Sequence, residues 1–192
     1  MRKSILIPFI VFVLISCGKE STLTDKQVED YTEQGKAIAD ASFKALSSQL
    51  KMALQAGGVK QAVVFCNAVA LPLTDSLSNE HSTVIKRTSL QLRNPKNEPD
   101  SMEVKMLKIY KQMSLMRNPV LVPKILEKNN NEIQFFAPII IKNETCLKCH
   151  GVLGKTMNEE DYEIIKQHYP NDEATGYKMD QVRGMWSITL KR

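Results

Sequence analysis

The chain has 192 residues, a formal net charge of +5 and a hydrophobic content of 43%, which suits one globular domain with a single core. Positive and negative charges are mixed along the sequence without a basic stripe, so nucleic acid is excluded as an expected partner. Four cysteines and three histidines are few enough for the position of each to be informative.

The N-terminus is typical of an export signal. A short basic start precedes the apolar stretch 5–15, which is too short for a stable membrane span and ends at Ser16-Cys17. The letters LISC at 14–17 resemble the lipobox of bacterial lipoproteins. This resemblance implies cleavage before Cys17 and a lipid on its sulfur. An uncleaved membrane anchor is the alternative interpretation.

Residues 1–16 are thus predicted to be a signal peptide, residues 17–24 a lipidated cysteine with its tether, and residues 25–192 one domain. Removal of the signal peptide lowers the net charge from +5 to +3. Each buried methylene of an acyl chain contributes about 0.8 kcal/mol, so several chains anchor a protein firmly. We expect an exported bacterial lipoprotein on a periplasm-facing membrane, with the outer membrane or the cell surface as further locations.

Helices dominate the first part of the predicted domain. Thr24 to Gln27 has the spacing of a capping box and begins a long helical pattern that Gly57-Gly58 ends. A second helix is predicted from about 59 to 77, with a break at Pro72. Its apolar face includes Cys66 at three-and-four spacing, which directs this thiol into the core.

Strands and helices mix in the rest of the chain. The predicted elements are strands at 82–90, 132–141 and 184–190 and helices at 101–116 and 159–168. Segment 92–100 is predicted to be a structured loop, and a loop around Asn118-Pro119 leads to a short helical piece near Leu126. Helices come first and strands alternate irregularly with helices later, so the order predicts an α+β fold with an antiparallel sheet.

The segment ETCLKCHG at 144–151 concentrates two cysteines and a histidine in five positions. Cys-x-x-Cys-His is the attachment pattern of c-type haem, in which both thiols form thioethers and the histidine binds the iron. Export agrees with this interpretation, because c-type attachment takes place outside the cytoplasm in bacteria. We predict one covalent haem c held by Cys146, Cys149 and His150.

Other interpretations of this motif compete with haem. A thioredoxin-like dithiol needs a βαβ context with the motif opening a helix, whereas here a predicted strand leads directly into the motif. A structural zinc site needs a fourth ligand nearby in space, and the sequence has no second C-x-x-C or H-x-x-x-H. A disulfide between Cys146 and Cys149 is the simplest alternative and stays open.

Spacing does not identify the ligand on the other side of the iron. His81, His168, Cys66 and the nine methionines can all bind haem iron. Each also has an ordinary role, as a surface loop residue, a helix-end residue or core filling. Cys66 remains unpaired once Cys17 is assigned to lipid and the motif takes the other two cysteines, and an odd thiol in an exported protein needs an explanation.

Four segments together resemble one family. They are VVFCNAVALPLTDSL, RTSLQLRNPKNEPD, FFAPIIIKNETCLKCHG and YPNDEATGYKMDQVRGMWSITL. In order and spacing they are similar to the single-haem, PAS-like c-type haem domains first described in cyanobacteria, which occur alone in the periplasm or as extracytoplasmic parts of sensor kinases. The resemblance covers nearly all of the mature chain. It implies a PAS-like antiparallel sheet with added N-terminal helices.

The resemblance also implies a second iron ligand. The family's cysteine-asparagine pair maps onto Cys66 and Asn67, which implies His150 and Cys66 on opposite sides of the iron. A thiolate donates charge to ferric iron and favours the oxidised state, so a low reduction potential is expected. Asn67 or nearby backbone amides are expected to hydrogen-bond the sulfur.

Several residues in the recognised segments are secondary candidates. Arg87, Arg93 and Arg183 are candidate contacts of the haem propionates. Asn94 and Trp186 are candidates for shaping the pocket. For each of these residues, loop fixation or core packing is the simpler explanation.

We therefore predict a membrane-anchored monohaem cytochrome c that exchanges electrons with a redox partner protein. Both axial positions are filled, so an enzyme such as a peroxidase is the least favoured interpretation. The alternative is an extracytoplasmic redox or gas sensor in which nitric oxide or carbon monoxide displaces Cys66. The sequence leaves the redox partner and the oligomeric state undetermined.

Overall fold

The structure is a computed structural model that describes residues 23–117 and 119–192. The predicted signal peptide, Cys17 and most of the predicted tether lie outside the described residues, as does Asn118 of the predicted loop. Among the described residues no single helix is long and apolar enough to cross a membrane. The helices Asp25–Ala68 and Ala70–Glu80 reach that length and hydropathy only when they are taken together, and they meet at a bend of 49°.

The long N-terminal helix is α1 (Asp25–Ala68). Thr24 caps it, and both hydrogen bonds of the predicted capping box with Gln27 are present. The helix is bent at Gly57 and Gly58, and Gly58 adopts a φ of 63°, which a glycine tolerates without a steric cost. The glycine pair therefore divides α1 into a long first segment and a short second segment.

The helix α2 (Ala70–Glu80) follows after a break at Val69. Pro72 lies in its first turn, where the missing N–H has no helical partner to lose. The predicted interruption of the second helix is thus confirmed, with the new helix starting two residues before the proline.

The strands of the described chain are β1 (Val84–Thr88), β2 (Lys124–Asn129), β3 (Glu132–Ile140) and β4 (Val182–Lys191). They form an antiparallel sheet in the order β1-β4-β3-β2, so the last strand of the chain lies between the first and the third. This confirms the predicted α+β class with an antiparallel sheet.

The helical piece predicted near Leu126 is wrong, because this segment is the edge strand β2. A two-residue turn at Asn130 and Asn131 joins β2 to β3, and Ile125 pairs with Phe135. Exposure along β2 alternates between Ile125 and Leu126, which is the period of a strand. Charged residues on both sides of the strand conceal this alternation in the sequence.

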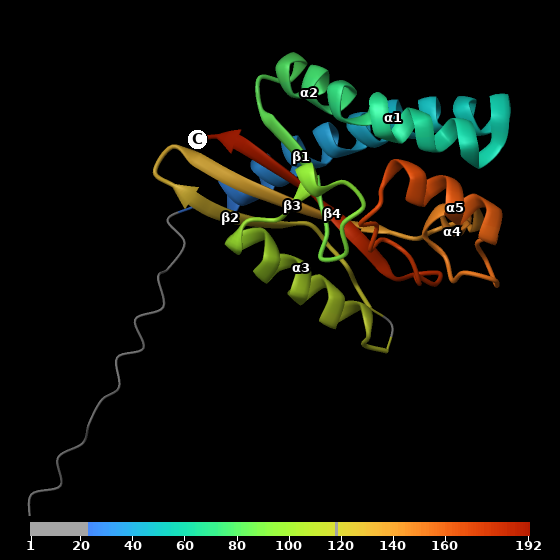
Figure 1. Ribbon diagram of the computed structural model, residues 1–192. Helices are drawn as coiled ribbons and strands as arrows, with labels where there is room; N and C mark the ends of the chain where they lie inside the picture. The colour runs from blue at the N-terminus through green and yellow to red at the C-terminus, as the bar shows by residue number, and fades with distance from the viewer. Residues whose placement is uncertain (1–22, 118) are drawn as a thin grey trace, which may run out of the picture.

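Helices cover both faces of the sheet, as Figure 1 shows: α1 and α2 lie on one face and α3 (Ser101–Ser114) on the other. Successive side chains of a strand point to opposite faces of the sheet. Phe135 and Ile188 therefore pack with α1, while Phe136 and Met185 pack with α3. A Cβ added at Gly35 of α1 would lie 2.3 Å from the Phe135 ring, so this glycine permits close packing of helix and sheet.

One end of the sheet carries the short helices α4 (Glu144–His150) and α5 (Glu159–His168), which Figure 1 shows beside the second segment of α1. Val63 of α1 packs with Ile165 and Tyr169, and Cys149 lies against this cluster. The loop after β1 contains the short 3-10 helix η1 (Pro95–Asn97). The fold thus gathers segments distant in sequence at the end of the sheet that holds the cysteine motif.

Candidate functional site

The cysteine motif forms the helix α4, which the sequence interpretation missed. The side-chain oxygen of Asn143 caps it by accepting a hydrogen bond from the Cys146 N–H at 3.2 Å. Asn143 is the signal that could have predicted this helix. Because α4 follows an antiparallel strand, the βαβ context of a thioredoxin-like dithiol is still missing.

Cys146 and Cys149 are three residues apart on α4, so they lie on the same side of the helix. Both are free thiols, as is Cys66, and the disulfide that was the simplest alternative is not formed in the described chain. No group of three or more His, Cys, Asp or Glu side chains among the described residues could hold a bare metal ion.

His150 ends α4 and is oriented by a backbone carbonyl. Its Nδ1 lies 2.8 Å from the oxygen of Ala174, and a carbonyl oxygen can only accept, so Nδ1 carries the proton and Nε2 has a free lone pair. Nε of Arg183 lies 3.2 Å from the same Nδ1. One nitrogen cannot both donate and accept here, and we assign the shorter contact with Ala174 as the hydrogen bond.

The imidazole of His150 is held in its neutral form. Burial lowers its pKa well below the usual value, and the positive charges of Arg183 and Arg93 lower it further. Only the hydrogen bond with Ala174 acts in the opposite direction. A neutral imidazole with a free Nε2 is the form that binds a metal.

Cys66 lies in the last turn of α1, in the same region as the motif. Burial raises the pKa of its thiol, while the charges of Arg87 and Arg93 lower it. Burial also raises the pKa of Cys149 to about 11; Arg93 opposes this effect, and Cys66 adds to it. Because these two thiols influence each other electrostatically, the fold brings Cys66 close to the motif, as the family resemblance implies.

Arg93 ties the motif to the loop after α5. Its Nε and Nη2 donate to the carboxylate of Asp172 at 3.0 and 2.9 Å, and Nη2 donates to the carbonyl of Cys149 at 2.6 Å. The side chain of Asp172 is 0% exposed and that of Arg93 is 12% exposed. Protein oxygens accept from Nε and Nη2, so Arg93 positions the motif. The propionate contact of Arg93 stays a prediction, and it would have to use the remaining nitrogen of the guanidinium.

Arg87 of β1 is a partly buried cation without an acidic partner among the described residues. Its guanidinium lies 5.8 Å from the centroid of the Trp186 ring. Among the residues that the structure describes, it forms no ion pair and no hydrogen bond. Burial lowers the pKa of Arg87, and Cys66 and Tyr169 raise it. A buried cation is stabilised when an anion lies beside it.

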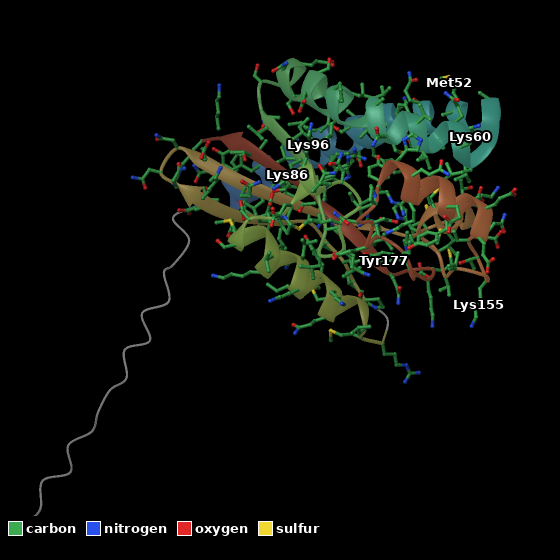
Figure 2. All side chains as sticks on the ribbon, viewed as in Figure 1. Met52, Lys60, Lys86, Lys96, Lys155 and Tyr177 are labelled. Atoms are coloured by element: carbon green, nitrogen blue, oxygen red, sulfur yellow. The ribbon has the colours of Figure 1, made fainter. Side chains whose placement is uncertain are left out.

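Arg183 of β4 lies next to His150. Its Nη1 donates to the carbonyl of Gln91 at 3.2 Å, and its guanidinium lies 5.4 Å from the centroid of the Tyr177 ring. Figure 2 labels Tyr177 at this end of the molecule. The structure therefore places all three predicted arginines around the motif or around Cys66, in three different environments.

Asn67 does not serve the sulfur of Cys66 as we expected. Its Nδ2 donates to the carbonyl of His168 at 3.4 Å, and its side chain also hydrogen-bonds Tyr169. Successive residues on a helix point about 100° apart, so Asn67 faces α5 when Cys66 faces the motif. Tyr169, whose pKa burial raises to about 12, is a neighbour of the site that sequence reasoning did not identify.

The other histidines differ in position. His168 ends α5 near the site. His81 ends α2 and precedes β1, whose first residue Val84 pairs with Thr189 near the end of β4. The motif instead follows the end of β3, where Ile139 pairs with Gly184 near the start of β4. His81 therefore lies at the opposite end of the sheet.

A cavity of about 610 Å³ lies beside the site, between the end of α1, the loop after β1 and the loop after α5. Asn67, Arg93, Asn94 and Tyr169 line it, whereas Cys66 and His150 are not part of its wall, so a role of Asn94 in shaping a haem pocket stays a prediction. Trp186 is a core residue beneath Arg87. Another cavity, of about 410 Å³, lies at the opposite end of the sheet around Ser78 and has no connection with the motif.

Comparisons with known proteins give one family and one solved structure. The family model described as Tll0287-like matches residues 20–191. The solved structure titled as that of the cyanobacterial heme-protein Tll0287 is similar with a TM-score of 0.56 and 20% sequence identity, over 83% of this chain and 95% of that chain. At this identity the likeness shows the fold. No curated protein matches the chain.

Proposed function

The chain belongs to the Tll0287-like family, and from this we propose that it is a haem protein in which Cys146 and Cys149 hold the porphyrin while His150 and Cys66 bind its iron. The family match and the fold confirm the resemblance to single-haem PAS-like haem domains. The heme-protein Tll0287 shares this fold, and haem binding by a relative supports the same cofactor here.

The observation that carries the proposal is the hydrogen bond between Nδ1 of His150 and the oxygen of Ala174. It fixes the tautomer, orients the ring and leaves Nε2 free, which is the outer-shell arrangement that metal-binding histidines use. The two free thiols of the motif precede this histidine on the same helix. The donor set therefore fits a covalently attached haem.

The surroundings of Cys66 fit an axial thiolate. Burial alone keeps this thiol protonated, so a thiolate needs both the iron and a positive charge nearby. Arg87 supplies that charge, because it lies partly buried near Cys66 and has no acidic partner among the described residues. A haem propionate is the alternative anion for Arg87, and either anion would neutralise the same partly buried cation.

When bound, the haem supplies one-electron exchange between ferric and ferrous iron. The chain's own residues orient the histidine and compensate the charge of the thiolate. With both axial positions occupied by protein, we propose electron transfer with a redox partner protein as the activity, and no catalysis. Export, the lipid on Cys17 and a periplasm-facing membrane remain parts of this proposal that lie outside the described residues.

A sensor is the second candidate function, and the cavity beside Asn67 favours it. A small ligand that reaches this cavity lies next to the helix turn that carries Cys66. Displacement of the thiolate by nitric oxide or carbon monoxide would release this turn. Addition of carbon monoxide to the reduced protein separates the two functions, since rapid tight binding supports sensing and inertness supports electron transfer.

The first test is production of the chain with the cytochrome c maturation system. We expect one haem that stays attached after denaturation and disappears in a Cys146→Ala/Cys149→Ala variant, as mass spectrometry measures. A chain that emerges without covalent haem, while a known cytochrome c matures in the same cells, contradicts the proposal.

The second test concerns the axial thiolate. Cys66→Ala is expected to remove the spectroscopic signature of thiolate-bound ferric haem and to raise the reduction potential, because the strong donor is lost. Ser42→Ala is the control, since Ser42 is a buried residue of the same helix α1 and its hydroxyl lacks a partner among the described residues. An unchanged spectrum in Cys66→Ala excludes this residue as the ligand and leaves haem attachment intact.

A further inference from the structure

The helix α3 and the chain that follows it differ in charge from the rest of the molecule. From Val104 to Leu126 the sequence has five lysines and arginines and no aspartate or glutamate. Residues 17–192 carry a net charge of +3, of which this segment contributes +5 and the remainder −2. The even mixture of charges noted for the whole chain therefore has one exception, and it is confined to one part of the fold.

This segment presents both its charges and its apolar side chains to solvent. We call the exposed set the basic–apolar surface, and its members are Lys105, Lys108, Ile109, Lys111, Leu115, Met116, Arg117, Val120, Val122 and Lys124. Within the described ranges none of its five cations takes part in an ion pair. Their positive field is thus uncompensated by neighbouring acids.

The apolar side chains of this surface are exposed to solvent and are not packed in a core. Leu115 is 75% exposed, Val120 71% and Met116 66%. Exposed apolar side chains that gather in one place mark a site of interaction with another surface. Figure 1 shows α3 on the face of the sheet opposite α1, so this surface is separate from the face on which α1 and α2 pack.

We propose that the basic–apolar surface docks on an anionic lipid bilayer, with its apolar side chains in the headgroup region and its lysines against the lipid phosphates. Protruding apolar residues flanked by cations are what interfacial binding requires. Three highly exposed apolar side chains are too few for a stable protein interface, which buries roughly 1,200 Å² or more. A bilayer needs less apolar area, because electrostatic attraction supplements it.

This docking would act together with the lipid predicted on Cys17. A single membrane signal gives weak binding, and a basic patch is one of the second signals that make anchoring stable. Contact through α3 would hold the domain in one orientation, with α1 and α2 directed away from the bilayer. The inference does not depend on haem, so its failure would leave the proposed cofactor and ligands unaffected.

The experiment measures vesicle binding without the lipid anchor. The chain from residue 17 onward carries Cys17→Ser, is exported behind a cleavable signal peptide and is loaded with haem. It is floated with vesicles of phosphatidylcholine alone or mixed with phosphatidylglycerol. We expect binding to the anionic vesicles, which weakens steeply with added salt.

Two variants test the surface itself. Lys105→Gln/Lys108→Gln/Lys111→Gln is expected to lower the partition coefficient on anionic vesicles about a hundredfold, since each lysine near such a surface contributes about a factor of five. Leu115→Ser/Met116→Ser is expected to lower it about tenfold or more, through loss of apolar burial. All five positions are exposed or half-exposed at the surface, and circular dichroism verifies that both variants fold.

Matched controls carry the same changes elsewhere. Lys51→Gln/Lys60→Gln/Lys155→Gln removes three exposed charges, and Met52→Ser removes an apolar side chain that is 51% exposed. Figure 2 labels Met52 and Lys60 on the α1 side and Lys155 at the α4 end, away from α3. Unchanged binding in both controls supports the proposal. Equal losses in variants and controls overturn it, and so does an absence of lipid binding, which would indicate an acidic protein as the partner.

Discussion

The end of the sheet that carries the motif and the face that α3 covers bury very different side chains. At the motif end, Arg87 and Arg93 lie near Cys66 and Arg183 lies near His150, and within the described ranges Arg93 is the one of the three that forms an ion pair. The α3 face is instead closed by Met106, Phe136, Met185 and similar apolar groups. Its buried Glu103 is compensated by Lys86 at 2.7 Å and by the cap of α3.

This difference separates stability from function. On the α3 face every buried charge is matched within the protein, so the region needs nothing further to be stable. At the motif end the carboxylate of Asp172 lies near both Arg93 and Arg183, and Arg87 has no acidic partner among the described residues, so three positive charges face one negative charge. This excess of positive charge destabilises the chain unless an anionic group lies beside it. Haem with a thiolate ligand and two propionates supplies such groups. The region whose unmatched charges lower the stability of the folded chain is therefore the one that fits a cofactor.

The largest expected effect comes from removing the one matched arginine at the motif end. Arg93→Ala leaves Asp172 buried and unpaired, so we expect a loss of about 3–5 kcal/mol in the free energy of unfolding, measured by urea denaturation. It also frees the carbonyl of Cys149, and covalent haem yield should fall.

The control for Arg93→Ala is Lys142→Ala at an exposed pair. Lys142 and Asp180 are 64% and 70% exposed, so its loss should cost less than about 1 kcal/mol. Arg93→Met combined with Asp172→Leu removes both charges and should recover part of the stability but not the haem yield. Equal effects of Arg93→Ala and Lys142→Ala would contradict the positioning role of Arg93.

Next in size is a steric change on the α1 face. Gly35→Ala places a Cβ 2.3 Å from the ring of Phe135, which forces helix and sheet apart. Although alanine favours helices by about 1 kcal/mol over glycine, we expect a net loss of about 1–3 kcal/mol from overpacking. Gln34→Ala, one exposed position earlier, should change the thermal midpoint little. A stabilised Gly35→Ala variant would show that this contact is loose.

How much of this could be read from the sequence differs between the same regions. The first helix, its Thr24 cap and the strand ending near Ile140 follow from local pattern, and they are confirmed. The strand β2 was missed because it is an edge strand whose exposure depends on its partner β3. Local pattern fails where a neighbour distant in sequence determines the environment.

The candidate site shows the same limit more strongly. The motif and the leftover Cys66 could be singled out from the sequence, and the fold gathers them in one region. The role of Arg93 could not be predicted, because it depends on Asp172, a residue far along the chain. The orientation of Asn67 also depends on where α5 ends. Residue type can indicate chemistry, but partners require the fold.

The smallest effect tests the claim that the α3 face is complete without a ligand. The hydroxyl of Tyr110 donates toward the carbonyls of Val122 and Phe136 at 3.0 and 3.1 Å, and Tyr110 itself is 0% exposed. Tyr110→Phe keeps the ring and removes the hydroxyl, so we expect a loss of about 1 kcal/mol and an unchanged haem spectrum.

The pH dependence of Tyr110→Phe sharpens this test. Burial raises the pKa of Tyr110 above its ordinary value of 10.0, and a backbone hydrogen bond of Lys124 opposes this only in part. The unfolded chain therefore loses the phenol proton first as the pH rises, so the stability from this group is complete below pH 10 and falls above it. The wild type should lose stability above pH 10 more steeply than Tyr110→Phe in urea denaturation. Parallel curves would show that this phenol is not protected by the fold, and the α3 face would then be less tightly closed than the motif end.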